Sequence, residues 1–344
     1  MGRARRRTIV MTLAYPQGRL PATRPAPTGW GVGGSCEAGG VCGRYANSRR
    51  PEDLVEEFEV ERSTGPGPGQ VPAAARPDYN VAPTKPALVV LRREVPAEQV
   101  PDVDEVPLAA DPDGDPTADA ALEALPPAPT PAPRLLRLLT WGLVPSWAKD
   151  RSVGSRMINS RAESLLEKPA FRRAVLHRRC LVPADGWYEW QKSPTEKDAK
   201  GKPRKQPFWI HPGVDRPIAF AGIYEFWRDP AKEDADDAWL TTFSIVTTEA
   251  EPGLDVIHDR MPFVVPEDRW SAWLDPELTD PDDVRALLQP PVPGRFVATA
   301  VTTRVNAVTN NGPELLEPVP LADLRGVVDP ATGELIGAGE APLF

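Results

Sequence analysis

The stretch Cys180-Leu-Val-Pro-Ala-Asp-Gly-Trp-Tyr-Glu-Trp190 shows the pattern on which the fold prediction rests. A short apolar strand is followed by an Asp-Gly turn and a run of aromatic residues. Other segments are equally short, rich in β-branched or aromatic residues and bounded by turn residues: 87–91, 135–143, 208–210, 218–226, 241–247 and 296–305. Helical patterns fit 161–167, 170–178, 267–274 and 282–288. The sequence therefore predicts an α+β fold, a single domain with a curved, mostly antiparallel sheet and peripheral helices.

Several stretches interrupt this pattern. Their composition cannot bury enough apolar surface to offset the entropy of ordering, so we expect loops or disorder there. These stretches are 1–41, about 64–76, the Pro/Ala/Asp insert 95–133, the lysine-rich 192–206 and the acidic 229–237. After the first one, Asn47-Ser48 and Pro51 predict a capped helix whose Leu54 and Phe58 share one face. We expect an extension over 1–41, a domain over 42–320 with the insert 95–133, and a tail over 321–344.

The net charge of -9 is unevenly distributed. The insert 95–133 holds nine acidic residues and no Lys or Arg, whereas residues 144–180 hold nine basic and three acidic residues. A single run of this kind is more often a solvated surface, but the asymmetry is compatible with a phosphate-binding face. The three cysteines, Cys36, Cys42 and Cys180, have no metal-ligand or disulfide spacing, which favours a reducing cytosol. No apolar run approaches the roughly 18 residues of a membrane span, and residues 8–15 are too short and polar for a signal peptide.

Three polar positions lie near predicted strand ends or turns. Asn159 opens a predicted helix, Glu189 lies among aromatic residues, and His258 lies in a turn-rich loop. Each has a simpler explanation: Asn159 as a helix cap, Glu189 as an outward strand residue, and His258 as a surface histidine. Cys42, at the edge of the predicted domain, could likewise be a small buried apolar residue.

Eight ordered motifs overturn these separate readings. They are Cys42-Gly-Arg-Tyr45, Tyr79-Asn-Val-Ala-Pro-Thr84, Trp141-Gly-Leu-Val-Pro-Ser-Trp147, Asn159-Ser-Arg-Ala-Glu163, Arg179 to Trp190, Ala221-Gly-Ile-Tyr224, Thr247-Thr-Glu-Ala250 and Ile257-His-Asp-Arg-Met-Pro262. From Cys42 to about Pro318 the chain resembles the SRAP family of SOS-response-associated peptidases, or abasic-site processing proteins. The resemblance implies an α+β fold around a barrel-like sheet and covalent cross-linking to abasic sites in single-stranded DNA. It also implies that Cys42 is the nucleophile, with Asn159, Glu189 and His258 as its active-site partners.

The chemistry of an N-terminal cysteine suits that reaction. Its α-amine has a pKa of about 7.7 to 8.0, so a useful fraction is neutral and can attack the aldehyde of an opened abasic sugar. The thiol of the same residue can then close a five-membered thiazolidine ring on the imine carbon. We expect His258 to move protons during sugar opening and Asn159 to orient the amine or the sugar. The aromatic neighbours of Glu189 predict a raised pKa, which suits dehydration of the carbinolamine.

Six further residues are candidates for DNA contact. Arg44 and Arg161 suit phosphates, and we place Asn80 beside them. Pro83, Trp141 and Trp147 are candidates for stacking on bases or wedging between them, although core packing explains the two tryptophans equally well.

One departure from the family pattern concerns the start of the chain. Family members begin Met-Cys, whereas here Val41 and forty further residues precede Cys42, and an amide-bound nitrogen cannot form a Schiff base. Our hypothesis is that translation starts at a GTG codon written as Val41, with proteolytic removal of residues 1–41 as an alternative.

Other readings remain open at this stage. One is a thiol autopeptidase that uses Cys42 and His258, and the other is a non-enzymatic single-stranded DNA binder. We expect a cytoplasmic monomer that joins the nucleoid when DNA is damaged and that binds single-stranded DNA containing abasic sites. No metal, organic cofactor or membrane is implied.

Overall fold

A computed structural model describes residues 43–61, 76–93, 132–232 and 238–337 of the chain. Cys42, nearly all of the insert 95–133 and most of the stretch 64–76 lie outside these residues. The predictions made for them are therefore not tested.

Five strands close into a barrel, in the order β10, β4, β3, β6, β9 and back to β10. They are β3 (Pro86–Arg92), β4 (Arg134–Trp141), β6 (Arg179–Ala184), β9 (Ile218–Arg228) and β10 (Trp239–Glu249). All neighbours are antiparallel except β10 and β4, which run parallel. The barrel interior is filled by large side chains such as Trp141, Phe220 and Phe243, so it is a packed core. The predicted α+β fold with a barrel-like, mostly antiparallel sheet is confirmed.

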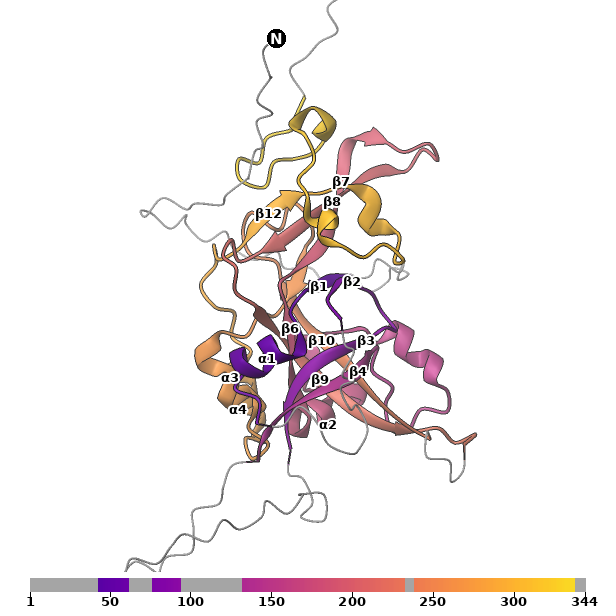
Figure 1. Ribbon diagram of the computed structural model, residues 1–344, viewed down its shortest axis with the longest axis vertical. Helices are drawn as coiled ribbons and strands as arrows, with labels where there is room; N and C mark the ends of the chain where they lie inside the picture. Colours follow the sequence, from indigo (N-terminus) through magenta and orange to yellow (C-terminus); the bar gives the residue numbers. More distant parts are fainter. Residues whose placement is uncertain (1–42, 62–75, 94–131, 233–237, 338–344) are drawn as a thin grey trace, which may run out of the picture.

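A second sheet covers one end of the barrel (Figure 1). Its order is β12 (Val297–Ala300), β8 (Pro203–His211), β7 (Gly186–Lys197), β1 (Tyr45–Asn47) and β2 (Asp78–Val81). Strand β6 passes into β7 with only Asp185 between them. At this corner Gly186 has no room for a side chain, because a Cβ would lie 2.3 Å from the carbonyl oxygen of Ile210. Tyr45 joins the two layers, with ring centroids 5.3 Å from Trp141 and 5.7 Å from Phe220.

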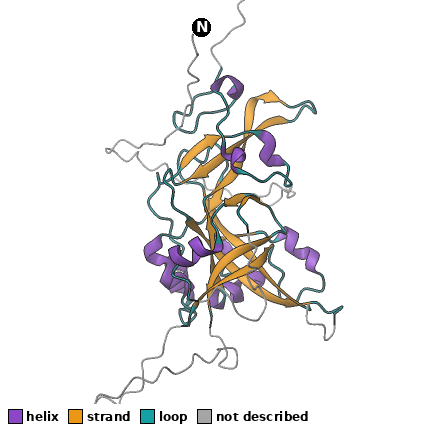
Figure 2. Cartoon of the chain, in the orientation of Figure 1, coloured by secondary structure: helices purple, strands orange, loops and turns teal. Residues whose placement is uncertain are grey.

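In the described residues, four short α-helices lie outside the strands (Figure 2). They are α1 (Pro51–Glu57), α2 (Pro169–His177), α3 (Trp270–Leu274) and α4 (Pro281–Leu287). Leu54 and Phe58 of the α1 region are fully buried, and Phe58 stacks on Trp270 at 4.5 Å. Helix α1 is thus confirmed, although its N-cap is Arg50 and not Asn47 or Ser48.

Two short strands extend β10 beyond the barrel. Strand β5 (Asn159–Arg161) pairs with β10 in parallel, and β11 (Arg260–Pro262) pairs with it antiparallel. The predicted helix over 161–167 is wrong: the chain forms β5 and then only the 3-10 turn η4 (Ala162–Ser164), with Arg161 at its N-cap. Asn159 is therefore a strand residue and not a helix cap, because pairing with β10 satisfies its backbone.

The lysine-rich stretch 192–206 is ordered, so the prediction of a loop or disorder there is wrong. It forms the distal part of the hairpin β7–β8. The C-terminal residues supply the missing stabilisation: the Gln191 side chain donates to Val328 O at 2.8 Å and accepts from Val328 N at 2.7 Å. Composition alone could not reveal this contact between residues 137 positions apart.

No helix in the described part of the chain is long and apolar enough to cross a membrane.

Candidate active site

The site is built on the first described residues of the chain. Tyr45 pairs with Trp187 and Ala46 with Gly186, and the Tyr188 amide donates to Arg44 O at 2.9 Å. Continuing this antiparallel register places Gly43 opposite Glu189. Glu189 is 2% exposed on β7. The structure thus brings a buried carboxyl-bearing residue next to the position that follows Cys42 in the chain.

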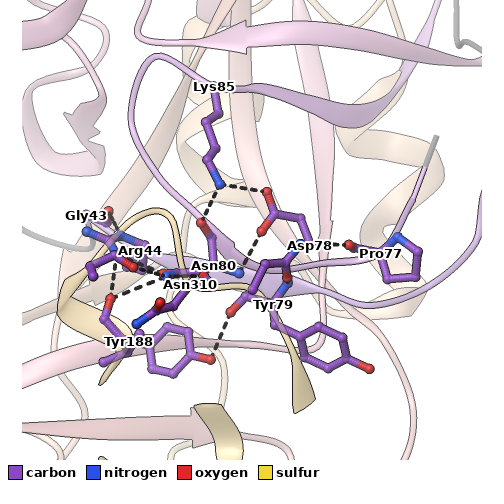
Figure 3. Close-up of polar contacts among 12 residues, drawn as sticks. Gly43, Arg44, Pro77, Asp78, Tyr79, Asn80, Lys85, Tyr188 and Asn310 are labelled. Carbon is purple, nitrogen blue, oxygen red and sulfur yellow. Dashed lines mark hydrogen bonds and ion pairs between the residues drawn. The ribbon is translucent and has the colours of Figure 1, made fainter. Parts of the chain in front are cut away.

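Arg44 lies in a network of polar groups at this edge (Figure 3). Its guanidinium donates to Asn80 Oδ1 at 2.8 Å and to Val305 O at 2.7 Å, and lies 6.0 Å from the ring centre of Trp190. Burial lowers the pKa of Arg44 from its usual value, against the opposing influence of Tyr188 and Asp78. The charge is held in place mainly by neutral acceptors, which leaves it available to an anion.

Asn80 has a different role from the predicted DNA contact. Its side chain is fully buried and donates to Ala307 O at 3.0 Å and Asn310 O at 2.8 Å. A residue with 0% exposure cannot touch a phosphate. Asn80 instead fixes Arg44 against the segment 305–310.

Trp141 is also buried completely, so the core-packing explanation applies and base stacking by this residue is corrected. Its indole Nε1 donates to Ile158 O at 2.8 Å, one residue before Asn159. Because Trp141 also packs on Tyr45, it joins the β1 side of the site to the β5 side.

Pro83 and Thr84 form an exposed turn beside these elements. Pro83 is half-buried, and Thr84 is exposed with a φ of 70°. A positive φ is unusual for a β-branched residue and is held here by two hydrogen bonds, from Thr84 N to Trp141 O at 2.8 Å and from Trp141 N to Lys85 O at 3.0 Å. The turn therefore presents Pro83 on a fixed backbone.

Arg260 is a functional candidate that the sequence analysis did not single out. It is 8% exposed and donates to both carboxylate oxygens of Glu163, at 2.8 and 2.9 Å, and to Thr247 O at 2.8 Å. This bidentate pair links β11 to the turn after β5 across β10. Arg260 lies inside the motif that contains His258, but its partner is 97 residues away. Position in that motif was the only signal in the sequence.

His258 is part-buried in the loop before β11. Its Nδ1 accepts from Arg260 N at 3.1 Å and lies 3.0 Å from a carboxylate oxygen of the exposed Asp259. Burial lowers the pKa of His258, with Asp259 acting in the opposite direction. The lowered pKa favours a neutral ring, which can accept the bond from the Arg260 amide, and Asp259 is exposed to solvent. In that state Nδ1 is the acceptor and the proton is on Nε2.

One core connects the predicted active-site positions. Tyr45, Trp187 and Ile257 are buried in the same cluster, and Ile158 packs against it. Tyr45 and Trp187 lie two positions from Gly43 and Glu189, respectively. Ile257 and Ile158 are the immediate neighbours of His258 and Asn159. Each of the four positions therefore borders the same core cluster, and their convergence on one site stays a prediction. A carboxyl group, an amide and an imidazole that met at the beginning of β1 would suit proton transfer at a carbonyl carbon.

Trp147 lies on the surface loop that connects β4 to β5. It is 67% exposed, while the next residue, Ala148, is buried and accepts at its carbonyl oxygen from Trp227 Nε1 at 2.7 Å. Lys149, Arg151, Arg156 and Arg161 are exposed on the same segment, 147–161. An exposed aromatic ring among cations is the combination found where single-stranded nucleic acid stacks.

Not every cation of the basic run 144–180 is available to a ligand. Arg179 is 4% exposed and donates to carbonyl oxygens of Trp273 at 2.6 Å, Val175 at 2.8 Å and Leu278 at 2.9 Å. Burial lowers its pKa to about 10, opposed by the charge of Asp275. Arg179 thus ties α2 to α3 and contributes nothing to a phosphate-binding face.

A cavity of about 510 Å³ lies beside the ends of β10 and β11. Its lining includes Glu163, Thr248, Glu251, Phe263 and Leu288 but none of the predicted site residues. Within the described ranges no group of three or more His, Cys, Asp or Glu residues is arranged to hold a metal ion.

The profile of the family described as "SOS response associated peptidase (SRAP)" matches residues 41–308. The abasic site processing protein YoqW of Bacillus subtilis is 33% identical over 277 residues, which cover 80% of this chain and 99% of YoqW. The abasic site processing protein HMCES of Pongo abelii is 31% identical over 217 residues, covering 55% of this chain and 58% of HMCES. A crystal structure of a Bordetella bronchiseptica protein has a TM-score of 0.50 at 20% identity and covers 76% of this chain and all of that one.

Proposed function

The chain belongs to the SRAP family, and we propose that it processes abasic sites in DNA by forming a covalent cross-link through Cys42. Relatives that match along nearly their whole length are named abasic site processing proteins. The observation that carries the proposal is the register between β1 and β7, which puts the residue after Cys42 opposite the buried Glu189. Cys42 directly precedes Gly43 in the chain, and consecutive Cα atoms are about 3.8 Å apart.

The reaction begins at the free α-amine of Cys42. The amine nitrogen attacks the sugar aldehyde carbon to give a carbinolamine, and loss of the hydroxyl as water leaves an imine. The Cys42 sulfur then bonds to the imine carbon and its proton passes to nitrogen, which closes a thiazolidine ring. The net change is aldehyde plus aminothiol to ring plus one water. Closing the ring removes the imine that would otherwise promote β-elimination and strand cleavage.

The neighbouring residues have separate parts in these steps. Glu189 donates the proton that lets water leave from the carbinolamine. His258, whose pKa is lowered by burial, exchanges a proton with the sugar oxygen when the ring opens or re-forms. Asn159 on β5 orients the amine or a sugar hydroxyl without titrating.

Binding of the single strand falls to residues on the rim. Arg44 and Arg161 contact phosphates, Trp147 stacks on a base, and Pro83 on its rigid turn wedges between bases. Asn80 and Trp141 act behind this surface, as positioning residues for Arg44 and for the β1–β5 junction. The substrate is DNA with an abasic site in a single-stranded region.

The test uses protein that begins at Cys42. It is expressed with an initiator Met at position 41, whose removal leaves Cys42 as the first residue. Incubation with single-stranded DNA carrying one abasic site should give an adduct that survives a denaturing gel and heat. Cys42→Ser retains the amine but cannot form the ring, so its product should appear only after chemical reduction of the imine. Protein that retains a residue before Cys42 should give neither product.

Two outcomes would overturn the proposal. One is the absence of an adduct from the correctly trimmed protein under conditions where a small aldehyde reacts with its terminal amine. The other is a heat-stable adduct from the Cys42→Ser variant without reduction. Intact mass of the native protein identifies its first residue, and a thiol-blocked sample that stays full length would point to self-processing at Val41.

A further inference from the structure

The distal part of the β7–β8 hairpin, residues 192–205, carries six cations against two acids. Both acids are already engaged: Asp198 Oδ1 accepts from the amides of Lys200 and Lys202, each at 2.9 Å, and Glu196 lies 3.6 Å from Arg325. The exposed cations are lysines, none of which forms an ion pair within the described part of the chain: Lys192, Lys197, Lys200, Lys202 and Lys205. The charge of the hairpin is therefore left uncompensated.

Two of these lysines face each other across the hairpin. Lys192 lies directly opposite Lys205 in the antiparallel ladder. Like charges in such a pair repel and destabilise the hairpin. A bound polyanion would remove this repulsion.

The two faces of the hairpin have different neighbours. The face with Gln191 and Ser193 is covered by residues 326–328, through the Gln191–Val328 bonds and a bond from Ser193 Oγ to Gly326 O. Because side chains alternate along a strand, Trp190 and Lys192 lie on the opposite face. That face carries Lys205 as well, since directly paired residues share a side.

This face begins beside Arg44, whereas Glu189, by the same alternation, lies on the face of Gln191. Trp190 Nε1 donates to Asn306 Oδ1 at 2.8 Å, so the face is open from Lys192 onward. Arg44 lies 6.0 Å from the ring of Trp190, two residues before Lys192. Burial lowers the pKa of His258, and the charge of Lys192 acts in the same direction. Arg44, Trp190, Lys192 and Lys205 thus lie on one face of the sheet, and the β7–β8 hairpin extends away from β1 (Figure 1).

We propose that the β7–β8 hairpin is a DNA-binding arm whose open face holds the phosphates of the strand flanking the lesion. The proposal rests on the proposed function, because it assumes that the lesion lies beside Gly43. From Glu189 to Lys197 the strand rises roughly 26 Å, at about 3.3 Å per residue. In a duplex this length spans about eight phosphates of one strand. The irregular register between Lys192 and Lys197 shortens the reach somewhat.

The experiment compares two variants with the same change in charge. Lys202→Gln with Lys205→Gln neutralises the arm, and Lys168→Gln with Arg173→Gln neutralises two exposed cations around α2. Binding of each full-length variant is measured by fluorescence anisotropy between 50 and 200 mM salt. The probes carry a stable abasic analogue in a five-nucleotide strand, in a strand with twelve-nucleotide single-stranded flanks, or with those flanks made duplex.

On the flanked probes the arm variant should lower the slope of log affinity against log salt by about 1.4 for single strands and about 1.8 for duplex, from 0.7 and 0.9 per phosphate contact. Wild type would then lose about sevenfold more affinity than the arm variant over this salt range on single strands. The α2 variant should match wild type, and all three proteins should bind the five-nucleotide probe alike. Whichever flank shows the change identifies the DNA form that the arm holds.

Equal slopes for the arm variant, the α2 variant and wild type on both flanked probes would overturn the proposal. So would an equal loss on the five-nucleotide probe, which would indicate a general charge effect. Neither result bears on cross-linking, which is read separately as adduct formation by the protein that begins at Cys42. The arm variant should unfold at the same temperature as wild type or a higher one, since it relieves the Lys192–Lys205 repulsion.

Discussion

Replacing Asn80 by Ala should both destabilise the protein and weaken DNA binding, the second effect acting only through Arg44. The side chain of Asn80 makes three short hydrogen bonds: it accepts from the Arg44 guanidinium at 2.8 Å and donates to Ala307 O and Asn310 O at 3.0 and 2.8 Å. Its full burial leaves these partners without an immediate substitute. An unsatisfied buried group costs about 1–3 kcal/mol, and a bond to a charged group is worth about 1.5–3 kcal/mol.

Arg44 keeps its bond to Val305 O and the ring of Trp190, and water can enter part of the space. We therefore expect a loss of about 3 kcal/mol in the free energy of unfolding, which is below the simple sum. For a domain of this size that corresponds to a fall in melting temperature of roughly 6–12 °C. Thermal unfolding followed by circular dichroism measures it.

Asn311→Ala is the matched control. Asn311 also bonds to the β2 region, accepting from Tyr79 N at 2.8 Å and donating to Pro77 O at 3.3 Å, but it is exposed. Water can replace its bonds, so the melting temperature should fall by less than about 3 °C.

A double-mutant cycle separates the effect on DNA. Arg44→Ala, Asn80→Ala and the double variant are compared for affinity to single-stranded DNA at a temperature where all are folded. If Asn80 acts by holding Arg44, the double variant should bind no more weakly than Arg44→Ala alone. Additive losses, or a melting temperature within 1 °C of wild type for Asn80→Ala, would refute the reasoning.

Three further predictions concern the rim of the site. Glu163→Gln should lower the free energy of unfolding by about 1–2 kcal/mol at pH 7, because Arg260 loses its bidentate carboxylate partner while Glu163 itself is half exposed. Burial opposes ionisation of Glu163, but the Arg260 bonds prevail and lower its pKa. The stabilisation is therefore present above about pH 4.5 and is lost as the pH falls through the lowered pKa. Thermal unfolding at pH 7 and pH 3.5 tests this, and an equal difference at both values would contradict it. The rate of adduct formation should fall about tenfold per pH unit below the amine pKa of about 8. It should fall more steeply at a pH below the ordinary imidazole value of about 6.5, because burial lowers the pKa at which His258 becomes protonated. Initial rates of wild type and His258→Ala between pH 5 and 8 test this, since the variant should lack the steeper part. Trp147→Ala should leave stability unchanged within about 0.5 kcal/mol, because the ring is 67% exposed, but should weaken single-strand binding by about 1–3 kcal/mol; unchanged binding by anisotropy would exclude stacking.

The strands of the barrel could be predicted because their residues are apolar, β-branched and bounded by turn residues. The same rules gave β3, β9 and β10 close to their observed limits. They failed for β1 and β2, which are only three and four residues long and contain polar residues. Strands of that length exist because neighbouring strands pair with them, and a local pattern does not contain that information.

The errors at Asn159 and in the lysine-rich stretch have a related cause. Asn-Ser-Arg before an apolar residue is typical of a helix start, yet β10 recruits these residues as a strand. The lysines resemble a solvated loop, yet residues 326–328 support them as a hairpin. In both cases a distant segment overrides the local preference.

The sequence indicated which residues belong to the candidate site, but not which of them are buried behind its surface. The motifs identified Arg44, Asn80 and Trp141 as one group, whereas only Arg44 is near the surface and the other two are fully buried behind it. Burial depends on how β1, β2 and β4 meet in space. The Arg260–Glu163 pair was missed for the same reason, since its partners lie on separate elements.

Strand β1 occupies an inner place in its sheet, with β7 on one side and β2 on the other. Chain ends usually fray, but a segment bonded along both edges is released only when the surrounding structure opens. If the reactive end of the protein is the residue before Gly43, a captured strand is tethered to one of the least detachable parts of the molecule. Clearing such a conjugate would then require the protein to be pulled apart and digested, so its lifetime on DNA would follow resistance to unfolding more than the mobility of its terminus.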